Sequence, residues 1–368
     1  MFSQDTDRRI PVTLLTGFLG AGKTTLLNHL LSQPEMANAA VLINEFGSVA
    51  VDHHLVTKID EDLIMLDSGC ICCTVRGDLT RSLTDLFMRS LQRKIVPINR
   101  VVIETTGLAD PAPVIFTLME DFFIAERFRI DGVVTVVDAT HAAGQLAQHP
   151  EAVKQVAMAD RLLLSKCDLA ERSEIDQLSQ TLRRINPAAA QIFVRRGEVA
   201  LALISGCGLY DPGSKTPDVA GWLAEEKVRE ERRKAHGHHH HHHDVNRHDA
   251  EVYSFALTFD QPLQWLCFVE AVSMLLQGMG DRILRIKGLL NVIGDDKPRV
   301  VQCVQHTNYP YTRLDDWPAE APYNDKHSRL VFIVRGLDQL LIEKAFAMFC
   351  GVLDGERREA LVAEGRMK

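Results

Sequence analysis

The chain has 368 residues, which is enough for two domains, and 46% of them are apolar, so a full core can be buried. Its net charge of -8 disfavours broad binding to nucleic acid or to a membrane surface. It has neither the roughly 18 uninterrupted apolar residues of a membrane span nor a signal-peptide core, so we expect a cytoplasmic protein with eight reduced cysteines.

In the first part of the chain, short apolar runs alternate with helical patterns. Continuous apolar runs are typical of strands that are buried on both faces, as in a parallel sheet. The expected strands are 12–15, 40–43, 63–66, 101–103, 132–137, 161–164 and 191–194, and the expected helices are 24–31, 79–91 and 173–185. This alternation predicts a doubly wound, mostly parallel α/β domain over residues 1–212.

The composition then changes. Residues 213–250 are charged and rich in histidine, which is typical of an exposed linker or loop. Regular patterns return after it, with expected strands at 251–257, 283–287, 299–304 and 329–334 and expected helices at 264–276 and 338–349. We therefore expect a smaller C-terminal α+β domain over residues 251–368.

The first motif is Gly17-Phe18-Leu19-Gly20-Ala21-Gly22-Lys23-Thr24, between an expected strand and an expected helix. That setting is typical of a phosphate-binding loop, in which backbone N–H groups surround an anion at a helix N-terminus. Lys23 would reach the β- and γ-phosphates and Thr24 would bind Mg²⁺. The nucleotide-binding residues expected here are Gly17, Gly20, Ala21, Gly22, Lys23 and Thr24.

Two further strand ends carry acids. Glu104 ends strand 101–103 beside the phosphate loop, where it can hold Mg²⁺ through water, and Gly107 could donate its N–H to the γ-phosphate. Asn44-Glu45-Phe46-Gly47 follows strand 40–43, where a γ-phosphate sensor is expected, and Asp52 is close behind. Either Glu45 or Asp52 could touch Mg²⁺ or position water; the alternative is an ordinary polar loop.

Ser165-Lys166-Cys167-Asp168 follows strand 161–164. The Asp168 carboxylate can accept hydrogen bonds from N1–H and the exocyclic amine of guanine, a donor pair that adenine lacks. Lys166 would lie along the base. The usual first residue of this pattern is Asn, so Ser165 is a departure, and a solvated turn is the alternative interpretation.

Cys70-Ile71-Cys72-Cys73 supplies three thiolates after a predicted strand and turn. They can provide three of the four ligands of tetrahedral Zn²⁺, with the fourth left open. Cu(I), Co²⁺ and Ni²⁺ remain alternatives, as do buried cysteines and a redox pair.

The histidine run offers neutral imidazoles that can collect metal loosely, unless it is only a polar tract. Four scattered cysteines, in or near apolar patterns, are expected in the core. The run comprises His238, His239, His240, His241, His242 and His243, and the four cysteines are Cys207, Cys267, Cys303 and Cys350.

Together these motifs resemble the CobW-type metallochaperone GTPases, in the order of that family. The resemblance implies GTP hydrolysis coupled to delivery of a divalent metal, most often zinc, to a client metalloprotein. It assigns phosphate and Mg²⁺ to Gly22, Lys23, Thr24 and Thr25, and the switch and magnesium motifs to Glu45 and Glu104. The stretches that carry it are 13–25, 44–47, 69–73, 104–111, 131–134, 137–139, 284–288 and 329–336.

By the same resemblance, Cys70, Cys72 and Cys73 bind the metal, and Lys166 and Asp168 read guanine. GTP and GDP, Mg²⁺ and Zn²⁺ are the implied ligands, with Co²⁺ or Ni²⁺ in place of zinc left open. The rival interpretations are a metal buffer that uses the histidine run, cobalt delivery to corrin synthesis, and a P-loop kinase or ATPase with structural cysteines. Whether the protein forms a homodimer is open.

Overall fold

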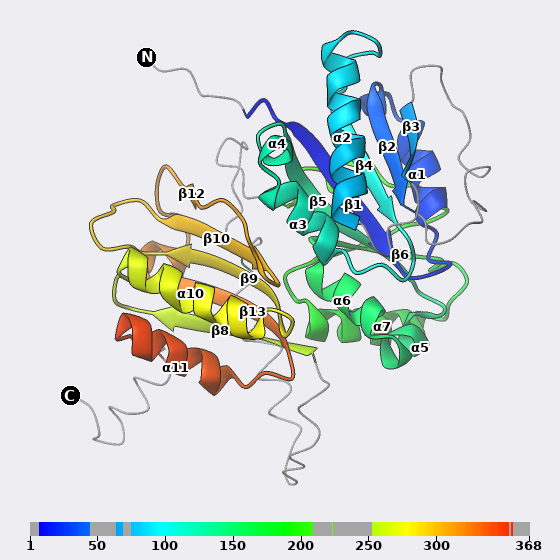
Figure 1. The fold of residues 1–368 in the computed structure, drawn as a ribbon. Helices are drawn as coiled ribbons and strands as arrows, with labels where there is room; N and C mark the ends of the chain where they lie inside the picture. The colour runs from blue at the N-terminus through cyan, green and yellow to red at the C-terminus, as the bar shows by residue number, and fades with distance from the viewer. Residues whose placement is uncertain are drawn as a thin grey trace. The chain divides into compact units, whose positions relative to one another are not determined.

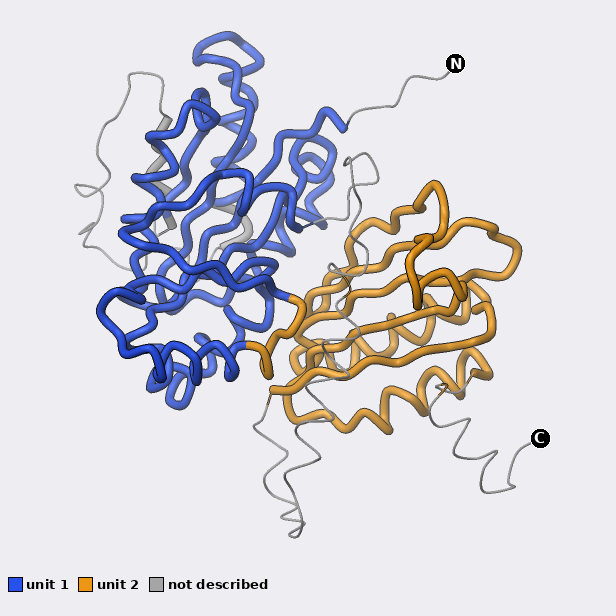
Figure 2. The backbone as a smooth tube through the Cα atoms, turned by 180° about the vertical axis from the view of Figure 1, so that it is seen from behind, with its two compact units in different colours: residues 1–182, 189–209 blue, residues 183–188, 210–368 orange. Residues whose placement is uncertain are grey.

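The computed structural model describes residues 7–44, 64–68, 75–208, 223, 252–352 and 355. The chain forms two compact units, residues 1–182 with 189–209 and residues 183–188 with 210–368 (Figure 2). In the described residues, each unit is built on its own β-sheet.

In the described part of the first unit, the sheet has seven strands in the order β3-β2-β4-β1-β5-β6-β7, and every neighbouring pair is parallel. Long runs of Val, Ile and Leu form these strands because both faces of a parallel sheet are covered. The expected doubly wound α/β fold is therefore confirmed. The strands are β1 Ile10–Gly17, β2 Ala39–Asn44, β3 Ile64–Ser68, β4 Arg100–Thr105, β5 Phe128–Asp138, β6 Arg161–Ser165 and β7 Ala190–Phe193.

Helices cover both faces of this sheet (Figure 1). One core contains the leucines of α1 with Leu15, Val41 and Val102 of the strands. No helix in the described part of the chain is long and apolar enough to cross a membrane. The helices are α1 Lys23–Leu31, α2 Val75–Leu91, α3 Ala112–Glu120, α4 Phe122–Ala125, α5 Ala142–Gln148, α6 Pro150–Met158 and α7 Arg172–Ile185, with 3₁₀ turns at Pro34–Met36 and Leu201–Leu203.

The sequence patterns located the seven strands but missed α3, α4, α5 and α6. These helices have 4 to 9 residues, too few for the helical period to stand out from the strands around them. The expectation that every strand is buried on both faces was wrong for β7. Phe193 is 56% exposed, because β7 lies at the edge of the sheet and, among the strands that the structure describes, pairs with β6 alone.

The second unit contains an antiparallel sheet in the order β11-β10-β9-β13-β8, with β12 paired to β10. Helices α10 and α11 lie together on one face of it (Figure 1). Between them and the sheet, Phe255 stacks on Phe332 at 5.1 Å between ring centroids. The elements are β8 Val252–Phe259, α10 Trp265–Met279, β9 Ile283–Leu290, β10 Arg299–Val304, β11 Thr307–Asn308, β12 Thr312–Arg313, a 3₁₀ turn Tyr323–Asp325, β13 Ser328–Arg335 and α11 Gln339–Cys350.

Two of the four cysteines expected in the core are buried, Cys207 and Cys303, and burial raises the pKa of the Cys303 thiol to about 12. Cys350 is only partly buried but packs against the core of the second unit, whereas for Cys267, which is partly exposed, the expectation was wrong. Cys267 lies in the first turn of α10 and Cys350 is the last residue of α11, and helix ends are less covered than helix centres.

Candidate nucleotide site

The carboxyl ends of four strands meet at one edge of the parallel sheet. Glu104 of β4 pairs in register with Leu15 of β1 on one side and with Ile43 of β2 on the other. Asn44 of β2 then pairs with Ser68, the last residue of β3. The ends of these strands therefore lie side by side, at the edge where open α/β sheets bind ligands.

The phosphate-loop residues lie at the end of β1. Only glycine fits at position 17, because a Cβ would lie 2.3 Å from the carbonyl oxygen of Val136 on β5. Lys23 opens α1 and is buried, and its Nζ donates to the carbonyl oxygens of Gly17 (2.9 Å) and Phe18 (3.2 Å). The ammonium group thus lies inside the loop, at the N-terminal end of a helix that favours anions.

A hydroxyl and a carboxylate lie next to this loop. The Thr24 hydroxyl donates to Glu104 Oε1 across 3.3 Å, and the Glu104 side chain is buried. A second hydroxyl contact, from Thr105 Oγ1 to Thr16 Oγ1 at 2.8 Å, ties β4 to β1 beside them. Hard oxygen ligands of this kind suit Mg²⁺, so the chemistry of Thr24 and Glu104 fits that ion. Thr25, the next residue, is exposed.

Gly107 lies directly against the phosphate loop. A Cβ at this position would come within 2.5 Å of the backbone nitrogen of Leu19, so a side chain cannot be accommodated without movement. The Thr105–Gly107 segment and the phosphate loop therefore touch through backbone, as a loop that senses the γ-phosphate requires.

The segment 165–168, which the sequence predicts to bind the base, also contacts the phosphate loop. The Ser165 hydroxyl donates to the carbonyl oxygen of Ala21 at 2.7 Å. Lys166, at a positive φ of 56°, donates through Nζ to the carbonyl oxygen of Gly20 at 2.7 Å. Asp168 is exposed at the next turn. Ser165 thus makes a contact with the loop although it is not the usual Asn.

Asp138, at the end of β5, holds Lys166 from the other side. Its carboxylate is buried and accepts hydrogen bonds from Lys166 Nζ (2.7 Å), the backbone N–H of Thr140 (2.9 Å) and the Thr140 hydroxyl (2.6 Å). Burial alone would raise the pKa of Asp138, but these hydrogen bonds and the Lys166 charge outweigh it and hold the pKa below its ordinary value. The carboxylate is therefore charged at neutral pH.

Asp138 lies in the stretch 137–139, which carries part of the family resemblance, but no role for it was expected from the sequence. Its signal was an acid at the end of a strand that neighbours β1, the same signal that pointed to Glu104.

The predicted metal and switch residues lie outside the described residues. They are Glu45, Phe46, Gly47, Asp52, Cys70, Cys72, Cys73 and His238 to His243, together with the Asn44 side chain. Within the ranges that are described, no group of three or more His, Cys, Asp or Glu side chains is arranged to hold a metal ion. These assignments stay predictions.

Comparison with known families gives two matches along the chain. The family model "CobW/HypB/UreG, nucleotide-binding domain" matches residues 11–193, and "Cobalamin synthesis protein cobW C-terminal domain" matches residues 252–350. The first match contains the phosphate loop and the Lys166 segment. The second spans β8 to α11 of the antiparallel unit.

Individual proteins are similar over most of the chain. The zinc chaperone YjiA of Escherichia coli (strain K12) is 36% identical over 340 residues, which cover 92% of this chain and 98% of YjiA. The zinc chaperone CobW of a Sinorhizobium species is 31% identical over 325 residues, covering 80% of this chain and 85% of CobW. The crystal structure of the Zn(II)-bound YjiA GTPase superposes with a TM-score of 0.66 at 30% identity, covering 93% of this chain and 99% of that one.

Proposed function

Because the chain belongs to the CobW/HypB/UreG family and is a metallochaperone GTPase, we propose that it binds zinc at Cys70, Cys72 and Cys73 and delivers it to a client metalloprotein. The observation that carries the proposal is the register of β3 with β2 and of β2 with β4. Ser68, two residues before Cys70, pairs with Asn44, and Asn44 pairs with Thr105. The strands that precede the thiolate segment and the two expected phosphate-sensing segments therefore end at the same edge of the sheet. We also place the protein in the cytoplasm, where thiols stay reduced.

Nucleotide hydrolysis would use the residues around the phosphate loop. Lys23 Nζ, which now donates to two loop carbonyls, would turn to the β- and γ-phosphate oxygens. Thr24 and Glu104 would hold Mg²⁺, which when bound neutralises charge that develops on the phosphates. Gly107 would donate its N–H to the γ-phosphate. Glu45 would orient the water whose oxygen attacks the γ-phosphorus as the bond to the bridging oxygen breaks.

The metal is the cargo of this cycle. Three thiolates leave one position of a tetrahedral zinc shell open, which suits an ion that has to be transferred. A γ-phosphate that orders the segment after β2 would change the neighbouring segment after β3, and linkage requires that zinc and GTP alter each other's affinity by the same factor. The histidine run would collect metal loosely, and Co²⁺ or Ni²⁺ can occupy the same kind of site.

Zinc titration tests this coupling. We expect isothermal titration into reduced protein to find one tight site whose affinity differs by about 5- to 150-fold between the GDP and GTP-analogue states, the usual range for allosteric coupling. Cys72→Ala should abolish that site. Cys350→Ala, at a partly exposed free cysteine outside the predicted nucleotide and metal motifs, is the matched control and should retain it.

Other outcomes of the titration identify the rivals. A tight site with the same affinity in every nucleotide state would contradict the coupled carrier. A site that survives Cys72→Ala but disappears when residues 236–243 are deleted would identify a metal buffer that uses the histidine run.

Guanine recognition is tested separately. We expect Asp168→Asn to weaken GTP binding about 10- to 100-fold, since the amide cannot accept both hydrogen bonds that the carboxylate accepts from guanine. ATP binding should not change. Asp176→Asn, at another acid on the same unit, is the control. Equal GTP affinity in wild type and Asp168→Asn, measured with a fluorescent analogue, would favour the ATPase interpretation.

A further inference from the structure

Helix α6 contacts the loop that follows β4. Gln155 Nε2 donates to the carbonyl oxygens of Gly107 (3.2 Å) and Ala109 (3.0 Å). One residue earlier on the helix, Lys154 Nζ forms an ion pair with Asp110 at 2.6 Å. Two consecutive residues of α6 therefore hold three positions of the segment 107–110.

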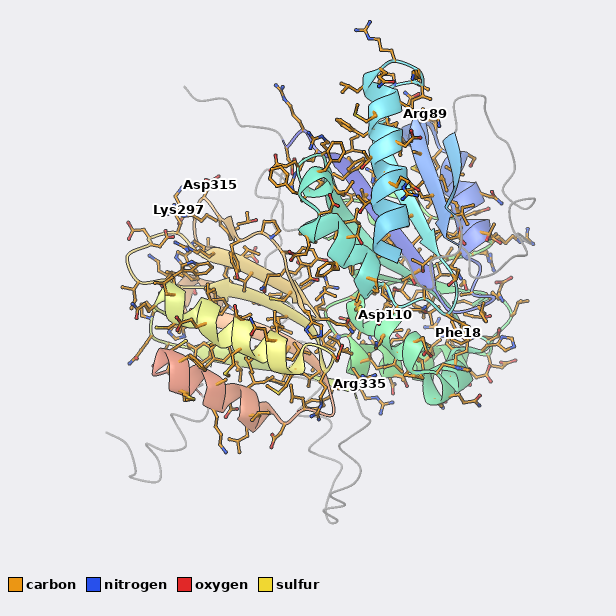
Figure 3. All side chains as sticks on the ribbon, viewed as in Figure 1. Phe18, Arg89, Asp110, Lys297, Asp315 and Arg335 are labelled. Carbon is orange, nitrogen blue, oxygen red and sulfur yellow. The ribbon has the colours of Figure 1, made fainter. Side chains whose placement is uncertain are left out.

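The same part of the chain also contacts the phosphate loop. The ring of His149, the residue before α6, lies 4.7 Å from that of Phe18, centroid to centroid. Figure 3 labels Phe18 and Asp110 beside the green helices that follow β5. On the sheet side, the Thr135 hydroxyl of β5 donates to the carbonyl oxygen of Gln155 at 2.8 Å, so the backbone that carries Gln155 is fixed.

The Gln155 side chain is buried, with 1% of the residue exposed. The two hydrogen bonds that Nε2 donates determine which way the side-chain amide is oriented. Its Oε1 has no hydrogen-bond partner within the described residues. Gln155 and Phe18 are among the residues that line a cavity of about 10 Å³. The reverse orientation of the amide would place that oxygen against two carbonyl oxygens. A buried acceptor left without a partner costs free energy, so the two donated bonds are what keep the group in place.

We propose that Gln155 is a positioning residue for the GTPase reaction. Its amide fixes the peptide groups of Gly107 and Ala109, so the segment that senses the γ-phosphate is ordered before GTP binds, and Lys154 secures the end of that segment through Asp110. GDP has no γ-phosphate, so its affinity does not depend on the order of this segment. The inference rests on the proposed role of Gly107 as the γ-phosphate sensor.

The test is Gln155→Met, which keeps the length of the side chain and removes the donors. We expect affinity for a GTP analogue to fall about tenfold while affinity for GDP stays within twofold, and kcat for GTP hydrolysis to fall by a similar factor. Gln145→Met is the matched control, because Gln145 lines the same cavity from α5, and it should change neither. Lys154→Met, at a partly exposed ion pair, should shift the same ratio about threefold without disturbing the core.

Three results would overturn the inference. The first is an unchanged ratio of GTP-analogue affinity to GDP affinity in both Gln155→Met and Lys154→Met. The others are equal losses of affinity for the two nucleotides in Gln155→Met, or the same loss in Gln145→Met. Gly107→Ala, measured beside them, separates this inference from the role on which it rests. If Gly107→Ala leaves the ratio unchanged, the γ-phosphate role of Gly107 is wrong. If Gly107→Ala lowers the ratio and Gln155→Met does not, only the role of Gln155 is wrong.

Discussion

Lys23→Met is expected to lower kcat for GTP hydrolysis by about 10²- to 10³-fold, the effect of removing a preorganised group that stabilises developing charge. Met retains the length of the stem, and Lys23 is only 8% exposed, so the loop should keep its packing. The ammonium group lies within 3.2 Å of two loop carbonyls, and from there it would turn to the phosphate oxygens. Single-turnover phosphate release measures the effect.

The control is Lys94→Met, which removes an exposed lysine of the same unit. It should leave kcat, KM and the melting temperature unchanged. Hydrolysis by Lys23→Met at the wild-type rate would contradict the assignment of the phosphate loop as the catalytic site.

Glu104→Gln is expected to raise the Mg²⁺ concentration needed for half-maximal hydrolysis at least about tenfold, since it removes a full negative charge from the ion's surroundings. The amide oxygen can still accept from the Thr24 hydroxyl, now at 3.3 Å from Glu104 Oε1, so the local structure should persist. Part of the lost rate should return at high Mg²⁺. Steady-state hydrolysis across a magnesium titration gives both quantities.

Glu120→Gln, at an exposed acid at the end of α3, is the matched control and should not change the magnesium dependence. If Glu104→Gln has the wild-type magnesium requirement, another acid serves the ion. Glu45 and Asp52 would then be the next residues to substitute.

The strands of the first unit, and the functional loops that follow them, could be predicted from the sequence. Runs such as residues 101–103 are apolar because both faces of the sheet are covered. Lys23, Thr24 and Glu104 follow strands of one parallel sheet, so they were expected at the same edge of it. The pairing of Leu15 and Glu104 supports that placement, since it depends only on β1 and β4 being neighbours in a parallel sheet.

Other contacts could not be predicted, because they depend on which elements become neighbours. The bond between Lys166 and Asp138 exists because β5 pairs with β6, and no local pattern encodes that adjacency. Gln155 is a polar residue at a buried position of a nine-residue helix, where periodicity alone favours an apolar side chain. A polar residue at this position is explained only by the folded structure, in which its amide donates to the carbonyl oxygens of Gly107 and Ala109.

The bridge that Lys166 makes between Gly20 and Asp138 has a consequence for how long a nucleotide stays bound. These contacts join the predicted base-binding segment to the phosphate loop. If that segment binds the base, a nucleotide whose base has dissociated is still bound through its phosphates, close to the base-binding residues. Rebinding of the free end is then intramolecular and occurs at a high effective concentration. A nucleoside or a triphosphate alone lacks this advantage, and each should dissociate far faster than the intact nucleotide.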